Sequence, residues 1–144
     1  ASPGRWISVH PVGGVLGGGP VNGHRQEILK TWRANISGLA QCPNVTVKLG
    51  GLGMVSVGYD FHERGVPPGS EDLAEAWRPY IEHCIEAFGA DRCMFESNFP
   101  VDKQSSGYTE LWNAFKRITA GASAAEKKAL YSGTAARVYR MIAP

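Results

Sequence analysis

The sequence RCMFESNFPVDK, residues 92–103, begins as an apolar β-strand and breaks into a polar turn. The apolar residues 93–95 fit a buried strand. Asn98 then stands at the carboxyl end of that strand, and Pro100 stops the hydrogen-bond ladder because proline has no N–H. Polar side chains at the carboxyl ends of parallel strands are the usual place for chemistry in α/β sheets and barrels. This strand end is therefore the first candidate for a functional site.

The rest of the chain alternates between strand-like and helix-like patterns. Apolar and β-branched runs predict two earlier strands, at residues 6–10, ended by Pro11, and at residues 45–49. Apolar residues that recur every three or four positions, together with capping signals, predict helices. These helices are expected at about residues 24–41, 70–88 with Ser70 as its cap, 108–119, from Ser123 onward, and 135–141 after a break at Gly133.

Strands that alternate with helices indicate right-handed crossovers and a parallel sheet. A complete fold with three parallel strands would leave both outer strands as open edges. The sequence therefore predicts the C-terminal part of a larger (β/α)8 TIM barrel, with residues 1–144 as one partial barrel domain. A whole barrel needs about 250 residues, so we expect a chain of 144 residues to be a fragment.

Composition excludes several classes of protein. The net charge of +2 is too small to indicate a nucleic acid or an anionic membrane as partner. No apolar run reaches the roughly 20 residues that cross a bilayer, and the N-terminus does not read as a signal peptide. The three cysteines lack metal or disulfide spacing and fall where buried residues are expected, which favours reduced thiols and the cytoplasm.

Four segments together carry a family resemblance. They are HPVGG at residues 10–14, PNVTVKLGGL at 43–52, FGADRCMFESNFP at 88–100 and AARVY at 135–139. In this order they resemble the C-terminal half of the amidohydrolase-related (amidohydrolase 2) proteins, TIM-barrel enzymes that include lactonases and carboxylate decarboxylases. The resemblance implies that the three predicted strands are barrel strands six, seven and eight.

The resemblance also implies roles for two strand ends. His10 falls at the position of the strand-six histidine, a catalytic residue or metal ligand, and Asn98 falls where the family usually has an aspartate. The family implies a divalent metal such as zinc, but its His-x-His pair lies on a first strand that this sequence lacks. A neutral amide cannot act as a general base. Three alternatives follow: no metal, a changed mechanism, or an Asn98 that only binds substrate.

Two carboxylates flank Asn98 and either could replace the lost aspartate. Glu96 lies on the same strand face as Asn98 because side chains alternate along a strand. If that face looks into the barrel, Glu96 is a candidate acid or base. The alternative, which we slightly favour, is a salt bridge to Arg92 or Lys103. Asp102 is the second carboxylate.

Three cationic or polar residues are candidates for substrate binding. His62 lies on a loop of about 20 residues after the second strand, and long loops are often functional. Lys48 interrupts an apolar strand, where it either points inward to a carboxylate or reaches the rim. Arg25 begins a helix, where a positive charge is mildly unfavourable, and this hints at binding. For each residue the alternative is a solvated or structural side chain.

Two functions follow from these patterns. The first is a hydrolase or lyase of the amidohydrolase type that acts on a small carboxylate, lactone or amide, with an activated water as nucleophile. The second is a non-catalytic α/β fragment whose open sheet edges associate with themselves or pair with another chain to complete a barrel. On either interpretation we expect the 144-residue chain alone to lack activity.

Overall fold

The computed structural model describes residues 6–10, 12–18 and 23–141, and within them the three predicted strands form one sheet. Its strands are β1 (Ile7–Val9), β2 (Val45–Leu49) and β3 (Cys93–Phe95), in the order β1-β2-β3. Both pairings are parallel, with Val9 opposite Val47 and Leu49 opposite Phe95. Parallel neighbours joined by helical crossovers confirm the α/β class. Pro11, predicted to end the first strand, lies outside the described residues.

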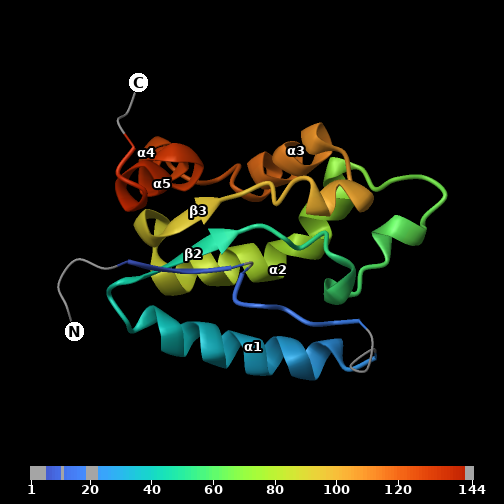
Figure 1. The fold of residues 1–144 in the computed structure, drawn as a ribbon, viewed down its shortest axis with the longest axis horizontal. Coiled ribbons are helices and arrows are strands. Elements are labelled where there is room, and N and C mark those ends of the chain that lie inside the picture. Colours follow the sequence, from blue (N-terminus) through green and yellow to red (C-terminus); the bar gives the residue numbers. More distant parts are fainter. Residues whose placement is uncertain (1–5, 11, 19–22, 142–144) are drawn as a thin grey trace.

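Helices connect the strands and cover one side of the sheet (Figure 1). The α-helices are α1 (Arg25–Ala40), α2 (Ser70–Phe88), α3 (Tyr108–Ile118), α4 (Ala124–Lys128) and α5 (Thr134–Val138), with a π-helical segment at Ala129–Gly133. Short 3-10 turns lie at Val55–Val57, Phe61–Glu63, Ala90–Arg92 and Val101–Gln104. The long loop after β2 therefore contains two local turns.

The hydrophobic core lies between the sheet and these helices. Val47, Leu49 and Phe95 point to this side and are buried. The Phe95 ring stacks on Phe115 of α3 at 4.4 Å between ring centroids, and Trp77 of α2 packs against the same Phe115. Burial of large aromatic side chains is a main source of stability in such a layer. The apolar stripes predicted for α2 and α3 are therefore confirmed.

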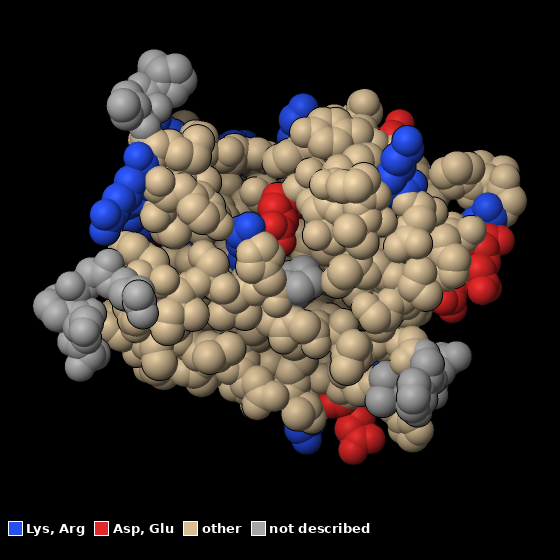
Figure 2. Space-filling view, in the orientation of Figure 1, with Lys and Arg blue, Asp and Glu red and all other residues tan. Residues whose placement is uncertain are grey.

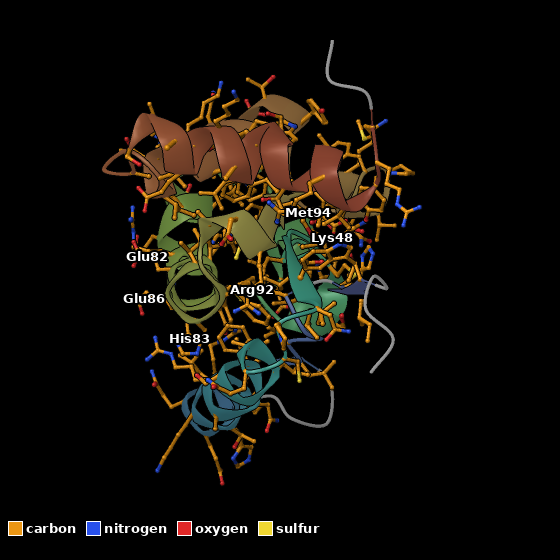
Figure 3. All side chains as sticks on the ribbon, turned by 90° about the vertical axis from the view of Figure 1, so that its left-hand side faces the viewer. Lys48, Glu82, His83, Glu86, Arg92 and Met94 are labelled. Carbon is orange, nitrogen blue, oxygen red and sulfur yellow. The ribbon has the colours of Figure 1, made fainter. Side chains whose placement is uncertain are left out.

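The opposite face of the sheet carries polar residues at the alternate positions of β1 and β2, and Met94 on β3. Ser8 on β1 contacts Thr46 on β2, with 3.1 Å between the hydroxyl oxygens. Lys48 is opposite Met94 in the strand register, and Figure 3 shows the two side by side, on the far side of the sheet from His83 of α2. In a closed barrel this is the face that looks inward. It is the face on which a strand-end site is expected.

Several local predictions need correction. Gly69, not Ser70, is the N-cap of α2, and its N–H donates to Asp72 Oδ2 at 2.9 Å. No break occurs at Gly133, because the π-helical segment continues into α5. Cys42 is exposed since it follows the end of α1, although Cys84 and Cys93 are buried as predicted. The capping box of Ser123 with Glu126 is confirmed.

Charged side chains are sparse on the face of the molecule seen in Figure 2. Apart from one contact between a positive and a negative group near its centre, they lie toward the rim of this view. Within the part of the chain that the structure describes, no helix is both long enough and apolar enough to cross a membrane.

Candidate functional site

Three side chains from three strand ends meet at the carboxyl edge of the polar face. The carboxylate of Glu96 lies 3.1 Å from Lys48 Nζ through Oε2, and 3.4 Å from His10 Nδ1 through Oε1. His10 follows β1, Lys48 is in β2 and Glu96 follows β3. We call these three residues the strand-end cluster. All three were candidates from sequence, but their contact depends on the sheet.

The Lys48–Glu96 pair is largely shielded from water. The exposed fractions of the two side chains are 18% and 17%, against 52% for His10. Burial lowers the pKa of Lys48, but hydrogen bonds and charge interactions with Glu96 and Tyr139 outweigh it, so the net pKa is raised. Lys48 is therefore a fixed positive charge at neutral pH, one that holds the Glu96 carboxylate and leaves Oε1 facing His10.

The position of Glu96 depends on a close approach to Gly50. A Cβ atom on Gly50 would collide with the backbone oxygen of Glu96 and lie 2.6 Å from its Cγ. The salt bridge of Glu96 to Arg92 or Lys103, which the sequence slightly favoured, is not formed. The guanidinium of Arg92 instead donates to the carbonyls of Ala40, Cys42 and Phe88, at 3.0 Å each.

Asn98 lies in the turn after β3, next to a second carboxylate. Its φ of +53° is left-handed, a conformation that asparagine tolerates better than most residues. Its Nδ2 donates to Asp102 Oδ1 at 2.6 Å, and the N–H of Gly53 donates to Asp102 Oδ2 at 3.1 Å. Burial raises the pKa of Asp102, although these two hydrogen bonds act in the opposite direction. Asp102 therefore orients Asn98 from inside the fold.

The remaining two candidates lie away from the strand-end cluster. Arg25 donates to the carbonyls of Val57 at 3.0 Å and Gly58 at 2.5 Å, and its guanidinium lies 4.2 Å from the centre of the Tyr59 ring. These contacts tie α1 to the loop after β2, so its observed role is structural. His62 lies in that same loop, 3.8 Å from Glu63. A substrate role for Arg25 or His62 stays a prediction.

The described residues do not by themselves form a metal site. Nowhere in residues 6–10, 12–18 and 23–141 do three His, Cys, Asp or Glu side chains come together in a way that could hold an ion. His10 and Glu96 are two such donors, but the ammonium of Lys48 occupies the other carboxylate oxygen. We therefore derive no chemical step through a metal, and His10 as a ligand stays a prediction.

A sequence model of the amidohydrolase family matches residues 16–141, which is most of the chain. The chain belongs to the amidohydrolase family. Among curated amidohydrolase relatives, L-fucono-1,5-lactonase of Burkholderia multivorans is 37% identical over 121 residues. The y4mH protein of Sinorhizobium fredii, which has no assigned function, is 46% identical over 110 residues.

Solved structures agree with this family. An amidohydrolase from Burkholderia multivorans with bound HEPES matches at a TM-score of 0.79 and 30% identity, over 96% of this chain and 45% of that one. A second crystal form of that protein, with bound zinc, matches at 0.76. The fold is therefore part of an amidohydrolase TIM barrel.

The chain spans about a third of the length of the curated relatives that it matches. It spans 37% of the lactonase and 33% of the y4mH protein, while 81% and 76% of this chain are covered. The three strands correspond to a minor part of a barrel of eight.

One member of the site was not a candidate from sequence: Tyr139, whose ring lies 5.7 Å from Lys48 Nζ. Its position at the chain end carried no local signal of this contact.

Proposed function

We propose that this chain supplies the last part of the barrel of a hydrolase that opens a small lactone by attack of an activated water. The observation that carries the proposal is the strand-end cluster, in which Glu96 joins Lys48 and His10 at the carboxyl edge of the sheet. In TIM barrels this edge holds the active site. The kinship with a lactonase supports the choice of bond.

In this proposal Glu96 is the general base. Its Oε1 is buried, lies 3.4 Å from His10 Nδ1 and makes no hydrogen bond to a described residue. In the proposed mechanism, this oxygen takes the proton of the attacking water. Lys48 fixes the carboxylate through Oε2 and places a positive charge near the oxyanion that forms on the lactone carbonyl. His10, half exposed, would protonate the ring oxygen as the C–O bond breaks.

Asn98 binds substrate in this mechanism and does not act as a base. Its side-chain nitrogen is held by Asp102, which fixes the orientation of the amide at the strand end. Of the three alternatives for Asn98, substrate binding is the one proposed, with Glu96 as the carboxylate that takes the proton. Glu96 thus occupies the chemical role, two residues earlier in the chain, that the family usually gives to an aspartate.

The test is hydrolysis of a sugar 1,5-lactone, followed by acid release at constant pH. Turnover is measured with the purified chain, alone and mixed with the N-terminal part of the Burkholderia lactonase, which supplies the strands that this chain does not contain. We expect Glu96→Gln to lower kcat by about 100-fold or more, the usual contribution of a positioned general base. Glu86→Gln, a change of the same kind at an exposed position on α2, serves as control.

Two results would overturn this proposal. One is turnover by E96Q equal to that of E86Q. The other is absence of lactone, ester or amide hydrolysis in both formats, with circular dichroism showing that the chain is folded.

A second function, that of a non-catalytic partner chain, has one observation in its favour. Strand β1 is at the edge of the described sheet, and the side chain of Ile7 in it is 53% exposed. An exposed apolar edge is a template for pairing with another strand. Sedimentation of the chain with and without the N-terminal part of the lactonase tests it, since a complex without turnover would favour this function over the hydrolase.

A further inference from the structure

A hollow lies between the loops that follow β2 and β3. It has a volume of about 470 Å³ and is lined from both loops. Figure 1 shows these loops together at the end of the sheet to which the strands point. In TIM barrels the loops after the seventh and eighth strands frequently bind an anionic group. The hollow is thus in a position that suits a ligand.

The charge of its lining is positive. Arg64 and Lys103 contribute this charge, and none of the described lining residues is acidic. Glu63 lies 3.8 Å from His62, but the ion pairs among described residues do not use Arg64 or Lys103. Two exposed cations from two separate loops therefore face one space, which favours an anion there.

Three aromatic residues also line the hollow. Phe61 and Phe99 contribute rings, and Tyr108 lies edge-on to Phe99 at 5.2 Å between centroids. The guanidinium of Arg64 lies 4.7 Å from the centre of the Phe61 ring, so the flat cation already rests on an aromatic face. A small inorganic anion would make no use of these surfaces. A ring that carries the anionic group would.

One buried hydroxyl in the lining also lacks a partner. Ser106 is 4% exposed, and its Oγ makes no hydrogen bond to any described residue. An unsatisfied buried hydroxyl is unfavourable, and an acceptor on a ligand would satisfy it. The neighbouring Ser105 is already used, because its hydroxyl donates to the carbonyl of Gly53 at 2.5 Å.

Two residues that line the hollow are sequence neighbours of residues in the turn after β3. Phe99, which lines it, directly follows Asn98, and Lys103 directly follows Asp102, the residue that orients Asn98. The turn that carries Asn98 and Asp102 therefore also contributes lining residues to the hollow.

We propose that this hollow binds the carboxylate of a ring-bearing organic acid. Arg64 and Lys103 hold the carboxylate, and Phe99 and Tyr108 contact the ring. The inference rests on the proposed function for one point only: that this acid is the substrate, which would then be a lactone or ester with a free carboxylate on its ring. Binding itself does not depend on turnover.

The test is titration of the purified chain with benzoate, followed by nuclear magnetic resonance shifts and calorimetry. We expect saturable binding that weakens about 10-fold or more in the double variant R64Q/K103Q, because two cations are removed. The double variant K30Q/R33Q removes the same charge from exposed positions on α1 and should bind as the native chain does. Benzamide, which has the ring without the charge, should bind more weakly than benzoate.

Three results would overturn the proposal: no saturable binding of benzoate, equal loss of binding in both double variants, or tighter binding of inorganic phosphate than of benzoate. Thermal melts of both variants establish that each is folded. Failure of the proposed function has a separate signature. In that case E96Q equals E86Q in turnover, or nothing is hydrolysed, while benzoate still binds and R64Q/K103Q still weakens it.

Discussion

At the scale of single residues, the position of Glu96 in the site depends on Gly50, which has no side chain to obstruct it. Gly50 directly follows β2 and Glu96 directly follows β3, and the absence of a side chain on Gly50 lets the two backbones meet. Glu96 can then reach Lys48 at 3.1 Å. A salt bridge that is mostly shielded from water is sensitive to such displacement, because each charge has given up hydration.

Substitution of Gly50 by alanine should therefore destabilise the protein. The new methyl group would collide with backbone atoms of Glu96, and overpacking of this kind costs about 1–3 kcal/mol. Gly38→Ala is the matched control, since a Cβ on Gly38 in α1 meets nothing within 4 Å. It should stabilise the helix by about 0.5–1 kcal/mol. Urea unfolding measures both, and changes of the same sign would contradict the prediction.

A second residue-scale prediction concerns pH and Asp102. Burial raises the pKa of this carboxyl in the folded protein, so the folded state holds its proton more tightly than the unfolded chain does. Its contribution to stability is therefore greatest below the ordinary pKa of about 3.9 and is lost as pH rises through the higher folded-state pKa.

Asp102→Asn should remove this dependence. The free energy of unfolding of the native protein, minus that of D102N, should grow as pH is lowered from neutral toward 4. Denaturant unfolding at several pH values measures this difference. A constant difference across the range would show that the proton of Asp102 is not linked to folding.

At the scale of elements, one arginine joins the ends of two helices. Arg92 donates to the carbonyls of Ala40, at the end of α1, of Phe88, at the end of α2, and of Cys42. Carbonyls at helix C-termini lack partners within the helix, and a cation there also interacts favourably with the helix dipole. Arg92 thus sets the distance between α1 and α2 just before the chain enters β3.

Loss of this contact should destabilise the fold. We expect Arg92→Met to lower the free energy of unfolding by about 1–3 kcal/mol, because three carbonyls lose a charged donor. Arg78→Met is the control. Among the described residues Arg78 pairs with Glu82, one helical turn away on the solvent side of α2, and such a pair is worth about 0.2–0.5 kcal/mol. Chemical denaturation compares the two, and equal losses would contradict the joining role of Arg92.

At the scale of the whole molecule, the described chain is a segment of a barrel wall. Helices cover one face of the sheet, and the other face carries the strand-end cluster (Figures 1 and 3). At the edge strand β1, Ile7 is 53% exposed. A barrel removes such an edge by closure, whereas an open wall leaves it available to another strand.

We therefore expect the chain to self-associate through β1. Ile7→Lys should shift it toward the monomer, because a charge on an edge strand opposes strand pairing. Val66→Lys places the same charge on a loop residue that is 79% exposed and should leave the association unchanged. Sedimentation velocity over a range of concentrations measures this. A native chain that stays monomeric and melts in one sharp transition would contradict it.

The sequence by itself determined the order of elements and the family. Apolar spacing located the strands and the long helices, and the segments at residues 43–52 and 88–100 identified the amidohydrolase barrel. Such features are local, because each depends on residues that lie close together in the sequence, within a single helix, strand or turn. The same local patterns named His10, Lys48, Glu96 and Asn98 as candidates.

Only the tertiary structure decided how those candidates are partnered. Glu96 contacts Lys48 and His10 instead of Arg92. Arg25 hydrogen-bonds the loop after β2. Asp102 lies inside the fold and accepts a hydrogen bond from the N–H of Gly53. Each of these contacts joins segments far apart in the chain, and the strand register and the packing of loops set which atoms meet. A short-range pattern carries no information about either, so the chemistry of this strand end could be located from sequence but not assembled from it.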